Sequence, residues 1–218
     1  MENQKKGKTV EIAHPLIIHK LTEMRKKDTP YYDFRRCLRE ITMMMVYELT
    51  RDLELKDIQI DTPVQPTTGK TIANPNITIV PVLRAGLGMV DPILEILPFA
   101  KVGHIGASRD EKTLEPKAYY DKMPDDVTKG HVIILDPMLA TGNTLAYSIK
   151  LLKEKYEVKD IKVLCLLSCP EGIKSLHDRH PDVDVYVAKI DEKLNEKGYI
   201  VPGLGDAGDR LYGTKEKF

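Results

Sequence analysis

Apolar residues recur at helical spacing in the first quarter of the chain. Within residues 29–53, they stand three or four positions apart and would form one stripe along a helix. The stripe consists of Phe34, Leu38, Ile41, Met45 and Leu49. The pattern therefore predicts an N-terminal helical region whose apolar face packs on a core.

From residue 57 the pattern changes to one typical of strands. Residues 58–64 alternate apolar and polar positions, as in a half-buried edge strand, whereas residues 77–83 are almost continuously apolar, as in a strand buried on both faces. Further strand-like runs cover residues 101–107, 131–135, 161–167 and 183–190. Helical patterns at 145–155 and 171–180 separate several of these runs. The alternation predicts an α/β fold with a mostly parallel, twisted sheet flanked by helices.

Two segments fit no predicted element. Residues 108–130 are long and charged, and residues 198–214 hold five glycines among seventeen residues. Long irregular segments with specific polar residues are usually functional, so we expect both to contribute to a site. No Pro/Gly/Ser-rich linker divides the chain, which predicts a single domain over residues 1–218.

Composition narrows the class of protein. The 218 residues include 33 Lys plus Arg and 33 Asp plus Glu, a formal net charge of +0, which gives no support for a nucleic-acid or membrane partner. The three cysteines show no CxxC spacing and stand among apolar residues, as expected of core thiols in a reducing compartment. The charged N-terminus is not followed by an apolar segment, and no run reaches the roughly 18 apolar residues of a membrane span. We expect a cytoplasmic protein.

The loop after residues 131–135 carries the clearest chemistry. Asp136 follows this predicted strand, small residues come next, and Thr144 is expected to open a helix. Strand ends and helix N-termini are where α/β sheets bind ligands and phosphates. An acid beside a phosphate cradle suits a phosphorylated ribose, with hydroxyls on the acid and the 5′-phosphate on the loop. The sequence contains neither GxxxxGK[ST] nor a GxGxxG after a strand, and an ordinary turn capped by Asp136 explains the loop alone equally well.

The motif "DPMLATGNT" resembles the phosphoribosyl diphosphate (PRPP) motif of the type I phosphoribosyltransferases, in the version of the uracil phosphoribosyltransferase family. The segments "HPLIIHKLTEMRKKDT", "VPVLRAGLGMVD", "VGHIGASRDEKTLEPKAYYDKMP" and "YGTK" are similar to the same family. The most specific of these similarities is "GYIVPGLGDAGDR" in the C-terminal loop. The resemblance covers residues 14–215 and implies an enzyme of pyrimidine salvage that converts uracil and PRPP into UMP and diphosphate.

The resemblance also implies roles for individual residues. Arg84 would bind the diphosphate, Arg109 would close over it from a mobile loop, and Asp136 would hold the ribose hydroxyls. The remaining PRPP-binding residues would be Pro137, Met138, Leu139, Ala140, Thr141, Gly142, Asn143 and Thr144.

This sequence departs from the family pattern at three positions. Asn143 replaces a glycine and Thr144 a serine, while Ser108 stands where a tyrosine is more frequent. Thr144 keeps the hydroxyl, and asparagine tolerates left-handed dihedral angles, so we expect the turn to be preserved.

By the same resemblance, the C-terminal loop would recognise uracil. Ile200, Gly205, Asp206 and Ala207 would make these contacts, largely through backbone groups that match the edge of the base. Asp206 would also act on Mg²⁺, the cofactor implied by the phosphates of PRPP. The predicted catalytic residues are Arg84, Arg109, Asp136 and Asp206. His177 and His180 are expected on the surface, and no His/Cys cluster points to zinc.

Two further expectations concern regulation and assembly. The resemblance implies a homo-oligomer, either a dimer or a tetramer, and it raises GTP as an effector that no residue of the sequence decides. The alternative function is a catalytically inactive, nucleotide-sensing regulator on the same fold.

Overall fold

A nine-stranded sheet forms the centre of the protein. The computed structural model describes residues 6–109 and 116–215. The sheet contains β1 (Thr9–Glu11), β4 (Ile77–Leu83), β5 (Lys101–Val102), β6 (His104–Arg109), β7 (Pro116–Lys122), β8 (His131–Leu135), β9 (Met138–Leu139), β10 (Ile161–Ser168) and β11 (Asp184–Ile190). Its main path is β1-β11-β10-β8-β4-β6-β7, and among the described strands of this sheet only β6 and β7 pair antiparallel. The expected mostly parallel α/β fold is confirmed.

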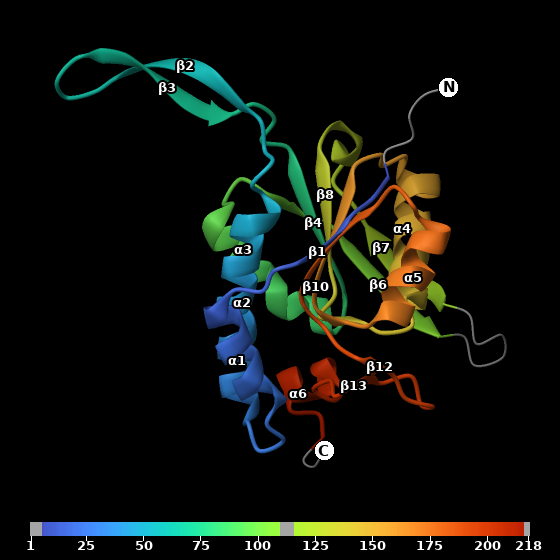
Figure 1. The fold of residues 1–218 in the computed structure, drawn as a ribbon. Coiled ribbons are helices and arrows are strands. Elements are labelled where there is room, and N and C mark those ends of the chain that lie inside the picture. The colour runs from blue at the N-terminus through green and yellow to red at the C-terminus, as the bar shows by residue number, and fades with distance from the viewer. Residues whose placement is uncertain (1–5, 110–115, 216–218) are drawn as a thin grey trace.

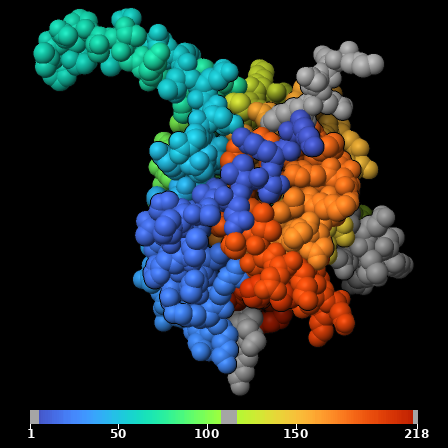
Figure 2. Space-filling view, in the orientation of Figure 1, coloured from blue at the N-terminus to red at the C-terminus, as the bar shows by residue number. Residues whose placement is uncertain are grey.

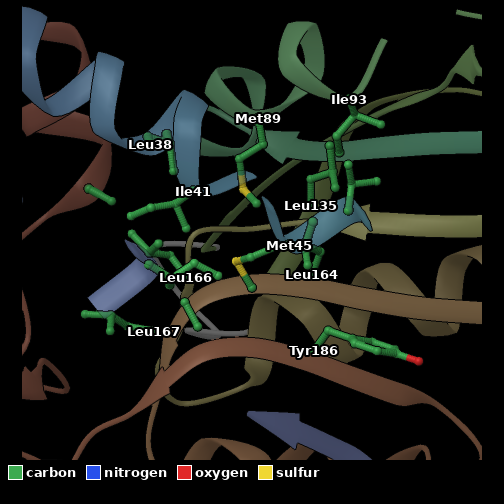
Figure 3. Packing of buried hydrophobic residues seen from close by; sticks show 14 of the residues in the cluster. Leu38, Ile41, Met45, Met89, Ile93, Leu135, Leu164, Leu166, Leu167 and Tyr186 are labelled. Carbon is green, nitrogen blue, oxygen red and sulfur yellow. The ribbon is translucent and has the colours of Figure 1, made fainter. Parts of the chain in front are cut away.

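Helices cover both faces of this sheet (Figure 1). One layer contains α1 (Pro15–Arg25), α2 (Tyr31–Leu49) and α3 (Val90–Ile96), and the other contains α4 (Asn143–Tyr156) and α5 (Pro170–Arg179). The predicted apolar stripe lies on α2, and all five of its residues are buried. Figure 3 shows Met45 of this stripe beside Leu135 and Leu164 of the sheet, and Leu38 and Ile41 belong to the same cluster. The helical prediction for the first quarter is therefore confirmed.

The three cysteines lie inside these layers, as predicted. Cys37 belongs to α2, Cys165 to β10, and Cys169 directly follows β10. Burial raises the pKa of each thiol above its usual value.

A long hairpin projects from the body of the protein (Figures 1 and 2). Its strands, β2 (Leu55–Asp61) and β3 (Pro66–Ile72), pair only with each other among the described residues. Every residue of β2 is exposed, so the prediction of a half-buried edge strand at 58–64 is wrong in its burial and its end. Alternation identifies the residues that share a face, but it does not show whether another element covers that face.

The two segments without predicted elements contain regular structure. The first includes β7 and the short helix η2 (Val127–Lys129), and the second includes β13 (Ile200–Val201) and α6 (Ala207–Tyr212). β13 forms a small antiparallel pair with β12 (Lys193–Leu194). These elements are too short or too polar to give a clear periodic signal. None of the helices in the described part of the chain has the length and apolarity needed to cross a membrane.

The position of the ligand crevice follows from the connections of β4 and β8. These strands are parallel neighbours, but the chain leaves them toward opposite faces of the sheet. After β4 it forms η1 (Ala85–Met89) and α3, which pack in the cluster beneath α1 and α2. After β8 it reaches α4, which packs in the cluster on the other face. Such a switch of direction opens a crevice at the carboxyl ends of the strands, and α6 and β13 lie beyond this end (Figure 1).

Candidate active site

Asp136 lies at the carboxyl end of β8, in the crevice that the fold creates. Its Oδ1 accepts a hydrogen bond from the backbone N–H of Met138 at 3.2 Å. Desolvation raises the pKa of the Asp136 carboxyl to about 7, because this single hydrogen bond does not offset the loss of water around the charged form. This desolvated carboxyl group can accept further hydrogen bonds from hydroxyl groups of a ligand.

The loop after Asp136 delivers the chain to the N-terminus of α4. Gly142 has φ +76° and precedes the first helical residue, Asn143. The left-handed position is therefore Gly142, and Asn143 has no need of the left-handed tolerance on which the expectation for this turn relied. Helix α4 begins one residue earlier than expected, so Thr144 is its second residue. The free N–H groups of its first turn face the same end of the sheet as Asp136.

Two residues of this loop turn inward. Pro137 is buried, and its carbonyl accepts hydrogen bonds from the backbone N–H groups of Leu166 and Leu167. The Leu139 side chain is fully buried in the cluster beneath α4, and its carbonyl accepts a hydrogen bond from Ser168. The backbone carbonyls of these two residues hold the loop on β10, and neither residue lines the cavity described below.

Arg84 directly follows β4 and contacts the C-terminal segment. Its Nη2 lies 3.1 Å from Oδ1 of Asp209, and its carbonyl accepts a hydrogen bond from the Tyr212 hydroxyl at 3.0 Å. Asp209 also accepts hydrogen bonds from Thr214 and Lys215. Lys215, Thr214 and Arg84 together lower the pKa of the Asp209 carboxyl to about 2. The Arg84 side chain is 55% exposed, which leaves its remaining N–H groups accessible from the crevice.

Arg109 is the last residue of β6. Its backbone lies in the sheet opposite Pro116 of β7, whereas its side chain and the loop of residues 110–115 lie outside the described residues. The predicted closing role of Arg109 therefore stays a prediction.

A cavity of about 250 Å³ joins the loop after β8 to the C-terminal segment. It is lined by Ala85, Asp136, Met138, Ala140, Gly198, Tyr199, Ile200, Gly205, Asp206, Ala207 and Gly208. Seven of the residues selected from the sequence share this cavity, although they come from two segments about sixty positions apart. All four residues assigned to the base are among them. The topology thus brings together the two halves of the predicted site.

Asp206 caps α6. Its Oδ1 accepts the backbone N–H of Asp209 at 2.8 Å, and the residue lines the cavity together with Asp136. Among the described residues, no group of three or more His, Cys, Asp or Glu side chains could enclose a metal ion. Two separate carboxylates suit Mg²⁺, which keeps several waters and is usually held through substrate phosphates.

Several cavity residues escaped the sequence analysis. Ala85, Gly198, Tyr199 and Gly208 line the cavity, but small residues and a half-exposed tyrosine carry no chemical signal of their own. Asp209, which the sequence did not single out, is 6% exposed and pairs with Arg84 next to this cavity. Its position three residues after Asp206, in the first turn of a helix, was the available signal.

The two histidines are not simple surface residues, so that prediction is wrong. His177 Nε2 lies 3.0 Å from the Val183 carbonyl, and His180 Nε2 lies 2.9 Å from the Ala146 carbonyl. Both side chains are partly buried, and desolvation lowers the pKa of His180. Their role is to link α5 to neighbouring backbone.

This fold and this arrangement of acid, loop and arginine are typical of a phosphoribosyltransferase. The family model for uracil phosphoribosyltransferase matches residues 11–214. This chain belongs to the uracil phosphoribosyltransferase family.

Relatives support this assignment along nearly the whole chain. A uracil phosphoribosyltransferase of Clostridium tetani is 58% identical over 209 residues, which cover 96% of this chain and 100% of the relative. One from Clostridium botulinum (strain Eklund 17B / Type B) is 55% identical with the same coverage. Among solved structures, the AQ2163 protein from Aquifex aeolicus superposes with a TM-score of 0.88 at 40% identity, over 95% of this chain and 99% of that one.

Proposed function

We propose that this protein transfers the 5-phosphoribosyl group of PRPP to uracil, giving UMP and diphosphate, in pyrimidine salvage. The observation that carries the proposal is the shared cavity, which sets Asp136 against the backbone of residues 198–208. One wall suits a phosphorylated sugar and the other a small planar base. Residues 1–218 are taken to act as a single domain.

The sugar half of PRPP would lie on the loop between β8 and α4. Asp136 would accept hydrogen bonds from the ribose hydroxyls, and the N–H groups and hydroxyls of residues 140–144 would bind the 5′-phosphate. The 14-residue helix α4 adds the positive end of its dipole to this site. Pro137 and Leu139 would shape the loop, so any contact of theirs with PRPP would be through backbone atoms.

The diphosphate would lie beside Arg84, with Arg109 reaching it from β6. Guanidinium groups match the paired oxygens of phosphates. Asp206 would contact a magnesium ion that travels with PRPP. When bound, Mg²⁺ neutralises charge on the departing diphosphate. The protein residues then hold this group in line with the reacting carbon.

Uracil would bind against Ile200, Gly205, Asp206 and Ala207. Fixed backbone donors and acceptors on this segment can match the edge of uracil and reject bases with a different pattern. The transfer passes through an oxocarbenium-like centre, so alignment of the two substrates and exclusion of water supply the catalysis rather than a protein nucleophile. An ionised Asp136 on the ribose hydroxyls also places negative charge near the developing cation.

Three finer points belong to this proposal. The chain is expected to form a homo-oligomer, and the exposed β2–β3 hairpin, with Ile58 and Ile60 on one face, supports such contacts. GTP is retained as a candidate effector. A cytoplasmic location is in keeping with three buried, unpaired cysteine thiols.

The test measures UMP formation from uracil, PRPP and Mg²⁺ by wild type and by Asp136→Asn. Asp178→Asn, in an exposed ion pair on α5, is the matched control. Wild type and control should form UMP, and Asp136→Asn should lose most of this activity. If wild type forms no nucleotide with uracil or any other base but still binds PRPP or UMP, the transferase proposal fails and the nucleotide-sensing regulator takes its place.

A further inference from the structure

A buried ion pair holds the middle of the segment assigned to uracil. Arg25, the last residue of α1, and Asp191, the first residue after β11, make two contacts. Arg25 Nη2 lies 2.6 Å from Asp191 Oδ1, and Nη1 lies 2.8 Å from Oδ2. The Asp191 side chain is 3% exposed, so the pair is largely shielded from water.

The same ion pair binds both polar groups of Gly203. Arg25 Nη1 donates to the Gly203 carbonyl at 2.7 Å, and the Gly203 N–H donates to Asp191 Oδ2 at 2.9 Å. Gly203 has φ +62°, and a Cβ there would lie 2.1 Å from the Ile200 carbonyl oxygen. The backbone is therefore fixed at one glycine by two charged side chains from distant parts of the chain.

Arg25 and Asp191 form a clamp around Gly203, and neighbouring contacts hold this clamp in place. The Asp191 N–H donates to the Ser168 carbonyl at 2.8 Å, which anchors the acid to the carboxyl end of β10. Arg210 donates from Nη1 to the Leu204 carbonyl at 2.9 Å and from Nη2 to the Lys26 carbonyl at 2.6 Å. Arg210 thus links Leu204, which follows Gly203, to Lys26, which follows Arg25.

The clamp does not line the cavity, but it holds a glycine that lies between two cavity-lining residues in the sequence. Ile200 precedes Gly203 by three residues and Gly205 follows it by two, and both line the cavity. Arg25 and Asp191 do not line it. Ser168 links the clamp to the loop of residues 136–144, because its carbonyl accepts the Asp191 N–H and its hydroxyl donates to the Leu139 carbonyl. This link runs through the Asp191 backbone, so changes to the side chains of Arg25 or Asp191 leave it in place.

We infer that Arg25 and Asp191 are positioning residues that set the uracil-selective backbone before the base arrives. This inference rests on the proposed function. A preformed segment avoids the entropy of ordering a loop on binding, and a small base offers few contacts to offset that entropy. Loss of the clamp should therefore weaken uracil binding and leave PRPP binding unchanged.

The kinetic test compares Asp191→Asn and Arg25→Lys with wild type. Asp182→Asn is the matched control, because Asp182 also accepts two contacts from one cation, Lys153, but does not line the cavity. We expect the KM for uracil to rise about tenfold or more in Asp191→Asn and by less in Arg25→Lys, with the KM for PRPP within about twofold of wild type. The control should match wild type in both constants.

Hydrogen exchange of unliganded wild type supplies a second test that needs no catalysis. Amides of residues 199–207 should exchange at least about a hundredfold more slowly than in the unfolded chain, and faster in Arg25→Lys than in wild type. The inference is overturned if this segment exchanges freely in wild type. It is also overturned if the folded variants keep the wild-type KM for uracil, or if both KM values rise together. An inactive wild type with a protected segment would instead reject the transferase proposal and, with it, the role in uracil binding.

Discussion

Arg84 and Asp209 form an ion pair between the loop after β4 and helix α6, with Nη2 and Oδ1 3.1 Å apart. The contact joins the arginine assigned to the diphosphate to the segment assigned to the base. Asp209 is nearly buried, whereas the Arg84 side chain is more than half exposed. The acid thus limits the motion of the arginine without covering it.

Asp209→Asn should raise the KM for PRPP about threefold to tenfold. Without the carboxylate, Arg84 loses an ionic partner, and ordering a free side chain on binding costs about 0.5–1.5 kcal/mol. Steady-state kinetics at saturating uracil would measure the change, with the KM for uracil within about twofold of wild type. Asp178→Asn serves as the control. An unchanged or lower KM for PRPP would show that Asp209 does not prepare Arg84.

The raised pKa of Asp136 predicts an acidic limb in the activity profile. Protonation below a pKa of about 7 removes the charge that would accept the ribose hydroxyls. The value of kcat/KM for PRPP should therefore rise between about pH 6 and pH 8, since this constant reports ionisations of the free enzyme. Asp136→Asn should lack this limb. PRPP also titrates, but wild type and variant share that ionisation, so a limb present in both would assign it to the substrate.

Asp136 should also limit stability above neutral pH. Its folded-state pKa lies above the unfolded value, so the folded protein holds more protons between about pH 4 and pH 7, and stability falls as pH rises through this window. Asp136→Asn removes the desolvated charge and should be more stable than wild type at pH 8, by on the order of 1–3 kcal/mol. Urea unfolding at pH 5 and pH 8 would measure this, with a smaller difference at pH 5. Equal stability at both values would contradict the desolvation of Asp136.

Gly142→Ala should damage both stability and PRPP binding. A side chain at φ +76° costs about 1–2 kcal/mol, and a Cβ there would lie 3.0 Å from the Gly172 carbonyl oxygen. Thermal unfolding and the KM for PRPP would measure the two effects. Gly69→Ala in the hairpin is the control, because its new Cβ would meet only the flexible side chains of Ile58 and Ile60. Similar losses in both variants would argue against a special role for the Gly142 turn.

The hairpin offers a test of assembly. Ile58 and Ile60 are 38% and 39% exposed on one face of β2. Changing both to Asp should shift the protein toward monomers in sedimentation velocity, because charged residues are excluded from the core of an interface. Gln59→Asp, on the opposite face, should keep the wild-type mass. A wild type that is monomeric at micromolar concentration would remove the hairpin as an assembly surface.

Much of the fold could be predicted from the sequence, because buried faces of helices and strands give periodic patterns of apolar residues. The stripe on α2 and the continuous run of β4 predicted both elements and their burial. The acid after β8 was equally readable, because strand–acid–loop–helix order fixes its place at the edge of the sheet. The short elements β13 and α6 were missed because glycines and two-residue strands carry no period.

The remaining wrong or missing predictions concern contacts between segments that are distant in the sequence. The exposure of β2, the contacts of His177 and His180, and the pairing of Asp209 with Arg84 depend on which segments meet in space. Local sequence gives the chemistry of a side chain but not its neighbour. The closing role of Arg109 stays a prediction, because its side chain lies outside the described residues.

Modification of the three buried cysteines would report when the packed layers of the protein separate. Cys37, Cys165 and Cys169 are shielded from water, and their raised pKa values keep little reactive thiolate at neutral pH. A thiol-modifying dye can therefore attack only molecules whose layers have separated, at rates set by those excursions. Cys165 lies in the central sheet and Cys37 in a covering helix, so the order of their modification would show which layer departs first.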